Sequence, residues 1–259
     1  MHLILPPSES KRPGGGGLFT AGSLSHAAQL GGTRTRVAAA LVSLSADEPA
    51  AVKQLKLGAK NRDERLHNLA LETSGTMAAI ARYTGVLYDA LDVESLAPNA
   101  LAWVREHVSI QSALFGLISA ADMIPSYRLS ASSRLPGLGA SLKRVWAEAH
   151  EPVMSRESRW TLDLRSQDYA ALAPLPPDLG DKLHVAQRGD DGHVRALNHF
   201  NKAAKGDLVR RLAESGAQIA DRADFLAWAD DRGLEVQDSG HGELTLVTEL
   251  GAPAVASRR

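Results

Sequence analysis

The chain has 259 residues, of which 44% are hydrophobic and 23% are charged. This balance is typical of a globular protein with a packed core, and it excludes a largely disordered chain. No apolar run approaches the roughly 20 residues needed to span a bilayer, so the sequence also excludes a membrane protein. The 29 basic and 30 acidic residues leave a net charge of -1, so any binding of nucleic acid must depend on a local basic patch.

Cysteine is absent from the sequence. Its absence excludes disulfides, a thiol nucleophile, cysteine-ligated zinc and iron–sulfur clusters. The first residues, from Met1 to Pro7, lack the positively charged stretch and the longer apolar run of a secretory signal. We therefore expect a cytoplasmic protein.

The first predicted element is a short buried strand over His2–Leu5, which ends at Pro6-Pro7 because proline cannot donate to a β-ladder. A polar segment, 8–13, and four glycines, 14–17, follow directly. Binding loops often occupy this position after a strand, and a mobile linker is the alternative. The glycines lack the spacing and the Lys-Ser/Thr ending of a phosphate-binding loop, so they predict no nucleotide site.

A basic pair of helices is predicted next. Residues 23–44 are compatible with a helix that Gly31-Gly32 interrupts, and residues 45–48 have the form of a capping box for the following helix. Gly58 suits a left-handed turn before a further helix over 61–71. We call residues 45–71 the basic hairpin. Its candidate DNA-binding residues are Lys53, Lys56, Lys60, Arg62 and Arg65. A solvated helix face is the alternative interpretation of these charges.

The rest of the chain alternates between helices and strands. Residues 77–83 fit either type, and residues 108–110 form a buried run. The later predicted helices are 95–106, 142–149, 201–214 and 221–229. The later predicted strands are 159–164, 183–187, 194–200, 234–236 and 244–247. The order has no regular crossover pattern, so we predict an α+β fold with a mixed sheet and surrounding helices rather than a doubly wound sheet. We expect one domain over residues 1–250 and a flexible tail over 251–259.

The segment from Asn198 to Arg211 is the most informative for chemistry. On a helix, Leu208 and Val209 define the inward stripe, and Lys202 and Lys205 fall on the same side. Such lysines can extend past the edge of the core into solvent, or they can form the floor of a cleft for an anion. The unpaired N–H groups of the helix N-terminus would add to an anion site.

Short pieces through nearly the whole chain, in the same order, resemble the YaaA peroxide-stress-resistance family of bacterial cytoplasmic proteins. The pieces are Leu5 to Lys11, Tyr83 to Tyr88, Leu114 to Ile118, Pro125 to Leu129, Trp146, Leu164 to Tyr169, Phe200 to Gly206, and Gly242 to Leu244. The ordered set carries the resemblance, because no single piece is diagnostic.

The resemblance implies a role in limiting oxidative damage by hydrogen peroxide, linked to lower free iron and to protection of DNA. It also implies a compact α+β fold with a helix-hairpin-helix-like element, and DNA binding by at least some members. The basic hairpin lies in the matching part of the chain, but residues 56–60 resemble the family's glycine-bearing turn only loosely. We therefore expect DNA binding through phosphate contacts, with little sequence preference and a steep dependence on salt.

An enzyme or a small-anion-binding protein is the alternative function. The family resemblance implies that Ser8, Lys11, Tyr127, Arg128 and Lys202 are polar residues around one pocket, and Lys205, on the same predicted helix face as Lys202, completes the candidate set. A desolvated lysine among them would act as a base or a nucleophile, and Arg128 would hold a carboxylate or a phosphate. The nine histidines are dispersed without metal-ligand spacing, so no metal site and no cofactor are predicted. Without cysteine, protection against peroxide cannot use a peroxidatic thiol.

Overall fold

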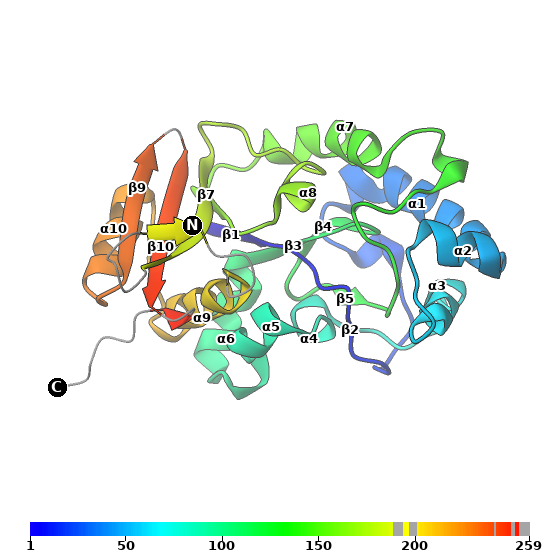
Figure 1. Cartoon of the computed structure of the whole chain (residues 1–259), viewed down its shortest axis with the longest axis horizontal. Coiled ribbons are helices and arrows are strands. Elements are labelled where there is room, and N and C mark those ends of the chain that lie inside the picture. Colours follow the sequence, from blue (N-terminus) through cyan, green and yellow to red (C-terminus); the bar gives the residue numbers. More distant parts are fainter. Residues whose placement is uncertain (189–193, 197–200, 241, 250–251, 254–259) are drawn as a thin grey trace.

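The computed structural model describes residues 1–188, 194–196, 201–240, 242–249 and 252–253 (Figure 1). The strands are β1 (His2–Leu5), β2 (Met77–Ala78), β3 (Val108–Ser112), β4 (Gly116–Ser119), β5 (Met123–Ile124), β6 (Thr161–Asp163), β7 (Gly180–Arg188), β8 (Val194–Ala196), β9 (Glu235–Gly240), β10 (Glu243–Glu249) and β11 (Ala252–Pro253). The α-helices are α1 (Ala27–Ala46), α2 (Glu48–Gln54), α3 (Arg65–Leu69), α4 (Ala79–Arg82), α5 (Val86–Leu91), α6 (Pro98–His107), α7 (Leu142–Met154), α8 (Gln167–Ala170), α9 (Asn201–Glu214) and α10 (Arg222–Asp230).

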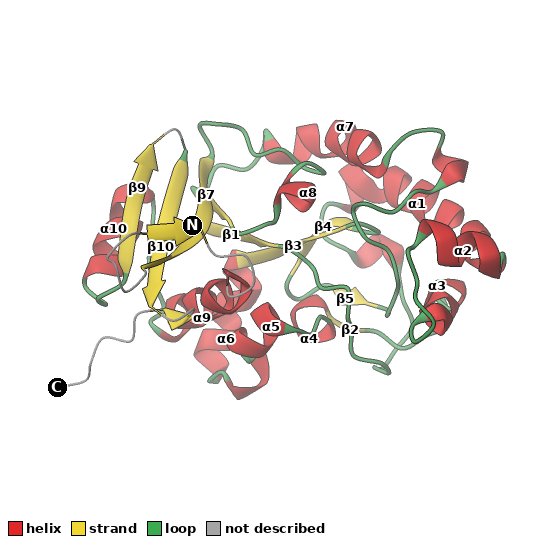
Figure 2. Cartoon of the chain, viewed as in Figure 1, coloured by secondary structure: helices red, strands yellow, loops and turns green. Residues whose placement is uncertain are grey.

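One mixed sheet organises the fold, in the order β11-β10-β7-β6-β1-β3-β4, with β8 paired to β7 and β9 paired to β10. The neighbouring strands β3, β1, β6, β7 and β10 run parallel. Helices lie on both sides of this sheet (Figure 2), so the predicted mixed sheet with surrounding helices is confirmed. The sequence pattern did not indicate the parallel run, because the connection from β1 to β3 spans residues 6–107 and has no single crossover helix.

Strand β1 lies at the centre of the core, and all of its residues are buried. Strand β3 pairs with one edge of β1, and β6 pairs with the other edge. Along the chain, β3 and β4 are therefore added on one side of β1, and β6, β7 and β10 are then added on the other side. In open sheets with parallel strands, the carboxyl ends of the strands at such a switch in direction commonly form a ligand crevice.

Most predicted elements are present, with shifted ends. The prediction for β1 matches the structure, and so does the helix over 201–214, which is α9. Residues 77–83, which fitted either type, divide between strand β2 and helix α4. Gly31-Gly32 do not interrupt α1, which continues through both glycines because its buried face, with Leu30 and Val37, packs into the core.

The basic hairpin forms two short helices, α2 and α3, at the end of the molecule opposite to β9 and β10 (Figure 1). Asp47 caps α2 by accepting a hydrogen bond from the Ala50 N–H at 3.0 Å. The left-handed residue of the connection is Lys56, at φ 55°, and not Gly58 as predicted. The structure does not confirm a helix-hairpin-helix element.

Two further predictions lie partly or wholly outside the described residues. The tail over 251–259 is described only at 252–253, where β11 pairs with β10. The last part of the strand predicted near 194–200 also falls outside, and the described part forms β8. Within the described ranges, every helix is too short or too polar to cross a membrane.

Candidate functional site

The polar and glycine-rich segment after β1 is a fixed loop and not a linker. Its backbone forms isolated bridges between Lys11 and Tyr83 and between Gly16 and Thr76. The guanidinium of Arg82, which is fully buried, donates hydrogen bonds to the carbonyl oxygens of Arg12, Gly14, Gly75 and Ile124 at 2.6 to 3.2 Å. One buried side chain thus ties the loop to two other segments of the chain.

Gly15 shows how closely this loop packs. Its φ is +114°, a conformation that residues with a side chain rarely adopt, and an added Cβ would lie 2.3 Å from the carbonyl oxygen of Thr76. The glycine therefore permits close contact between the backbones of residues 15 and 76. The loop in turn holds Lys11 next to Tyr83.

The ammonium group of Lys11 lies among carbonyl oxygens and aromatic rings. Its Nζ atom donates to the carbonyl oxygens of Ser8 at 3.0 Å and Glu9 at 3.3 Å. The same atom lies 4.0 Å from the centre of the Tyr127 ring and 5.3 Å from the centre of the Tyr83 ring. Cation–π attraction therefore supplements the hydrogen bonds at this nitrogen.

Burial lowers the pKa of Lys11 to about 7, from an ordinary value of 10.5. The nearby Glu9 and Glu64 carboxylates favour the charged form, whereas Arg128 and Arg82 oppose it. At neutral pH the amine is therefore near the midpoint of its titration. Such a lysine both accepts and donates a proton, and its neutral form is nucleophilic.

Three hydroxyl groups form a buried chain beside Lys11. The Tyr127 hydroxyl lies 2.8 Å from the Tyr83 hydroxyl and 2.8 Å from the Ser112 Oγ. Burial raises the pKa of Tyr83 to about 12 and that of Tyr127 well above its ordinary value. Both tyrosines are thus neutral at physiological pH, and the chain of hydroxyls can hold or pass a proton.

Arg128 lies between two carboxylates at the edge of the cluster. Its guanidinium forms ion pairs with Glu64 at 3.0 Å and with Glu9 at 3.5 Å. Asn68 fixes the backbone of Arg128, because its Oδ1 accepts from the Arg128 N–H at 2.7 Å and its Nδ2 donates to the Arg128 carbonyl oxygen at 3.0 Å. The distance to Glu9 exceeds that of a good hydrogen bond, so this carboxylate is the weaker partner.

We call Ser8, Glu9, Lys11, Tyr83, Ser112, Tyr127 and Arg128 the Lys11 cluster. Its members come from the loop after β1, from the carboxyl end of β3, and from segments that pack against them. The cluster therefore lies at the carboxyl ends of parallel strands, where the sheet changes its direction of growth.

The structure brings four of the six predicted pocket residues together: Ser8, Lys11, Tyr127 and Arg128. Lys205 is buried elsewhere, where its Nζ donates to the carbonyl oxygen of Leu164 at 2.9 Å and burial lowers its pKa to about 8. Lys202 is exposed. The prediction that Lys202 faces inward is wrong, because its side chain is exposed whereas Lys205, three residues further along α9, is buried.

Sequence reasoning missed several residues that hold the cluster together: Glu9, Glu64, Asn68, Arg82, Tyr83 and Ser112. Tyr83 belongs to one of the pieces that carry the family resemblance, so its place there was a usable signal. Arg82 and Glu64 gave no signal, because nothing in a sequence distinguishes a buried arginine from an exposed one or assigns an ion-pair partner.

The predicted DNA-binding residues divide into two groups. Arg65 pairs with Glu48 at 2.8 Å and Arg62 lies 3.7 Å from the same carboxylate, so both serve to hold the hairpin together. Lys53, Lys56 and Lys60 are exposed. Within the described part of the chain these three lysines form no ion pair, and Lys56 donates to the Ser132 Oγ at 3.3 Å.

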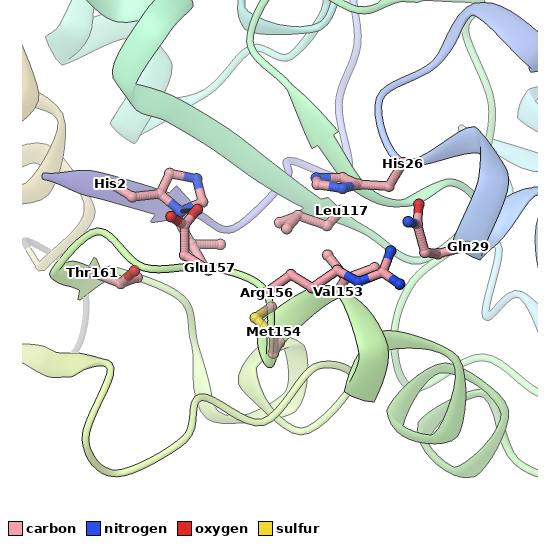
Figure 3. Close-up of a pocket in the computed structure, with 10 residues that line it drawn as sticks. His2, His26, Gln29, Leu117, Val153, Met154, Arg156, Glu157 and Thr161 are labelled. Carbon is pink, nitrogen blue, oxygen red and sulfur yellow. Dashed lines mark ion pairs between the residues drawn. The ribbon is translucent and has the colours of Figure 1, made fainter.

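A separate pocket of about 120 Å³ lies on the sheet beside the C-terminal end of α7. Figure 3 shows His2 and Glu157 side by side on one wall, with His26 and Gln29 on the opposite wall. The His2 ring lies 2.9 Å from the Ser109 Oγ and 3.0 Å from Glu157. Burial lowers the pKa of His2, so the ring is neutral at physiological pH.

The described residues contain no group of three or more metal-ligating side chains that would hold a metal ion. The Lys11 cluster itself offers a titrating amine, hydroxyl groups and a guanidinium.

Comparisons with known proteins give a consistent result. A family model described as "Peroxide stress protein YaaA" matches residues 1–239. A UPF0246 protein of Corynebacterium glutamicum is 38% identical over 249 residues, which cover 95% of this chain and 98% of the relative. A UPF0246 protein of Streptomyces coelicolor is 37% identical over 241 residues, which cover 92% of each chain.

Proposed function

Because the chain belongs to the YaaA peroxide stress protein family, we propose that it acts in resistance to peroxide through a ligand-binding site at Lys11. The site binds a small anionic molecule and exchanges a proton with it. The observation that carries this proposal is a lysine with a pKa of about 7, held 4.0 Å from the Tyr127 ring centre. Such perturbed groups concentrate at functional sites.

Arg128 supplies the positive charge that selects an anion. Its ion pair with Glu9 is long, at 3.5 Å, and the Glu9 side chain is 44% exposed. A carboxylate or phosphate group of a ligand replaces the Glu9 carboxylate, while Glu64 keeps its place at 3.0 Å. The ligand then lies next to the Lys11 amine and the hydroxyl chain, where proton transfer in either direction is favourable at neutral pH.

A test of this function uses peroxide survival in a bacterium that lacks its own family member. We expect the wild-type gene to restore survival and the Lys11→Met variant to leave it at the level of the empty strain, because methionine fills the volume but carries no proton. Lys143→Met, which removes an exposed lysine on α7, is the matched control and should restore survival fully. Equal protein levels are checked by immunoblot. Full survival with Lys11→Met would refute the role of Lys11.

Non-specific DNA binding is the second candidate function. The observation that favours it is the exposure of three lysines on the basic hairpin: Lys53 in α2, and Lys56 and Lys60 in the connection between α2 and α3. Three lysines that contact phosphates give modest affinity, which falls as the salt concentration rises because counterions are released on binding. The near-zero net charge of the chain adds no long-range attraction.

The DNA function is tested by titrating a duplex with protein at several salt concentrations. Changing Lys53, Lys56 and Lys60 to glutamine is expected to reduce the slope of log affinity against log salt by about 2.7, because each neutralised phosphate contributes roughly 0.9 to that slope. The control changes Arg105, Lys143 and Arg156, which are exposed elsewhere, to glutamine. An equal loss of affinity in both variants would show general electrostatic attraction and not a binding surface on the hairpin.

A further inference from the structure

A second and larger hollow lies between α1, the end of α3 and the segment before α1. It adjoins the Lys11 cluster through Phe115, whose ring centre lies 5.3 Å from that of Tyr127. Its volume is about 770 Å³, within the range of small-molecule sites. Most of its wall is apolar, formed by Phe19, Ala38, Val42, Leu69, Leu71 and Phe115. We call this hollow the α1 groove.

The α1 groove leaves apolar side chains in contact with water. Val42 is 37% exposed and Leu69 is 42% exposed. The ring of Phe19 packs against that of Phe115, with their centres 5.3 Å apart. Covering this surface with a hydrocarbon chain removes it from water, which favours binding of an apolar molecule.

One lining residue, Arg34, carries a charge into this apolar setting. Arg34 is only 3% exposed, and its guanidinium donates to the carbonyl oxygens of Phe115 at 2.7 Å, Ser25 at 2.6 Å and Leu117 at 3.0 Å. Its Nη1 atom is buried without a hydrogen-bond partner. A buried donor without a partner is costly, and the cost is larger for a charged group.

The charge of Arg34 also lacks a directly bonded carboxylate. No described acidic side chain forms an ion pair with Arg34. The Asp122 carboxylate accepts hydrogen bonds from the Ser25 N–H and hydroxyl groups, and it affects Arg34 only through longer-range electrostatic attraction. Burial lowers the pKa of Arg34 to about 10, so the guanidinium remains charged at neutral pH. A carboxylate at Nη1 would satisfy both the donor and the charge.

We propose that the α1 groove binds an amphipathic monocarboxylate of the fatty-acid type. The hydrocarbon chain lies along the apolar wall, and the carboxylate accepts a hydrogen bond from Arg34 Nη1. Because Nη1 is covered, a neighbouring side chain of the groove must move to admit the carboxylate. Glu72 lines the groove and is exposed, so it disfavours a second negative charge on the ligand.

Calorimetric titration with decanoate, below its micelle-forming concentration, tests the proposal against decanol as the neutral probe of the same length. We expect decanoate to bind at least about tenfold more tightly, because one charge-assisted hydrogen bond is worth at least about 1.5 kcal/mol. Failure of decanoate to bind, or equal affinity for decanol, would overturn the proposal.

Variants separate the groove from non-specific binding. Ala38→Trp fills the groove and should abolish binding of both probes, whereas Ala102→Trp, on the exposed side of α6, should leave it unchanged. Arg34→Met should reduce the affinity for decanoate to that for decanol, and if this variant does not fold, the comparison of the two probes on the wild-type protein decides. Retained binding by a folded Ala38→Trp variant would contradict the site. Lys11→Met should bind decanoate normally, because Lys11 does not line the groove. If the survival test refuted the proposed role of Lys11, the proposal of a fatty-acid site would therefore be unaffected.

Discussion

Replacing Arg82 by methionine is expected to lower the free energy of unfolding by about 4 kcal/mol. The side chain is fully buried and its guanidinium donates to four carbonyl oxygens, on Arg12, Gly14, Gly75 and Ile124. Methionine fills part of the volume but donates no hydrogen bond, so buried acceptors lose their partner. Urea unfolding monitored by circular dichroism measures the decrease.

The same change has a consequence at the candidate site. Arg82 holds the loop that carries Lys11, so we expect the loop to loosen, water to reach the amine, and the pKa of Lys11 to rise from about 7 toward its ordinary value. Arg36→Met removes an exposed arginine of α1 and is the control, with an expected change near zero. A decrease below about 1 kcal/mol in Arg82→Met would show that the loop is held by other interactions.

Replacing Gly206 by alanine is expected to destabilise the fold by about 3 kcal/mol or more. An added Cβ would lie 2.1 Å from the carbonyl oxygen of Leu87, a backbone atom that cannot move without separating α9 from α5. This close approach explains why a helix interior contains glycine despite its low helix propensity. Thermal unfolding measures the effect.

Gly32→Ala is the matched control for this prediction. Gly32 also lies inside a helix, α1, but nothing lies within 4 Å of its added Cβ. The substitution should stabilise the protein by about 0.5 to 1 kcal/mol, because alanine has the higher helix propensity. If both variants shifted stability by similar amounts, the close approach of α5 and α9 would not be the cause.

The sequence predicted those features that depend on local pattern. The prolines after His2–Leu5 defined β1, and apolar spacing defined α9 over Asn201–Glu214. The helix-hairpin-helix expectation depended on the turn around Gly58, where the structure places the left-handed conformation at Lys56. Turn geometry is set by the buried residues on either side, Leu55 and Leu57, which local sequence does not reveal.

The candidate site required information that no local pattern contains. Ser8, Lys11, Tyr127 and Arg128 were predicted as a group from the family resemblance, and the structure brings them together. The pKa of Lys11 depends on burial by segments more than 60 residues away along the chain, such as the Tyr83 and Tyr127 rings. For Lys202, helical spacing predicted an inward-facing side chain, whereas the structure leaves it exposed. Spacing alone contains no information on which part of a helix other segments cover.

The lowered pKa of Lys11 also couples stability to pH. The folded protein releases this proton near pH 7, whereas the unfolded chain keeps it until about pH 10.5. The unfolded state therefore binds more protons between these values, so the contribution of Lys11 to stability increases as the pH rises through this window. Below about pH 7 the buried ammonium imposes its full cost, and Lys11→Met removes the dependence.

An NMR titration of protein labelled with ¹³C at the lysine Cε tests most directly whether Lys11 titrates near neutral pH. Lys11→Met identifies the Lys11 signal, because that signal disappears from its spectrum. We expect a midpoint near pH 7 for this signal. A Lys11 midpoint near 10.5 would contradict the proposed site, because the amine would then be fully charged at neutral pH and unable to accept a proton.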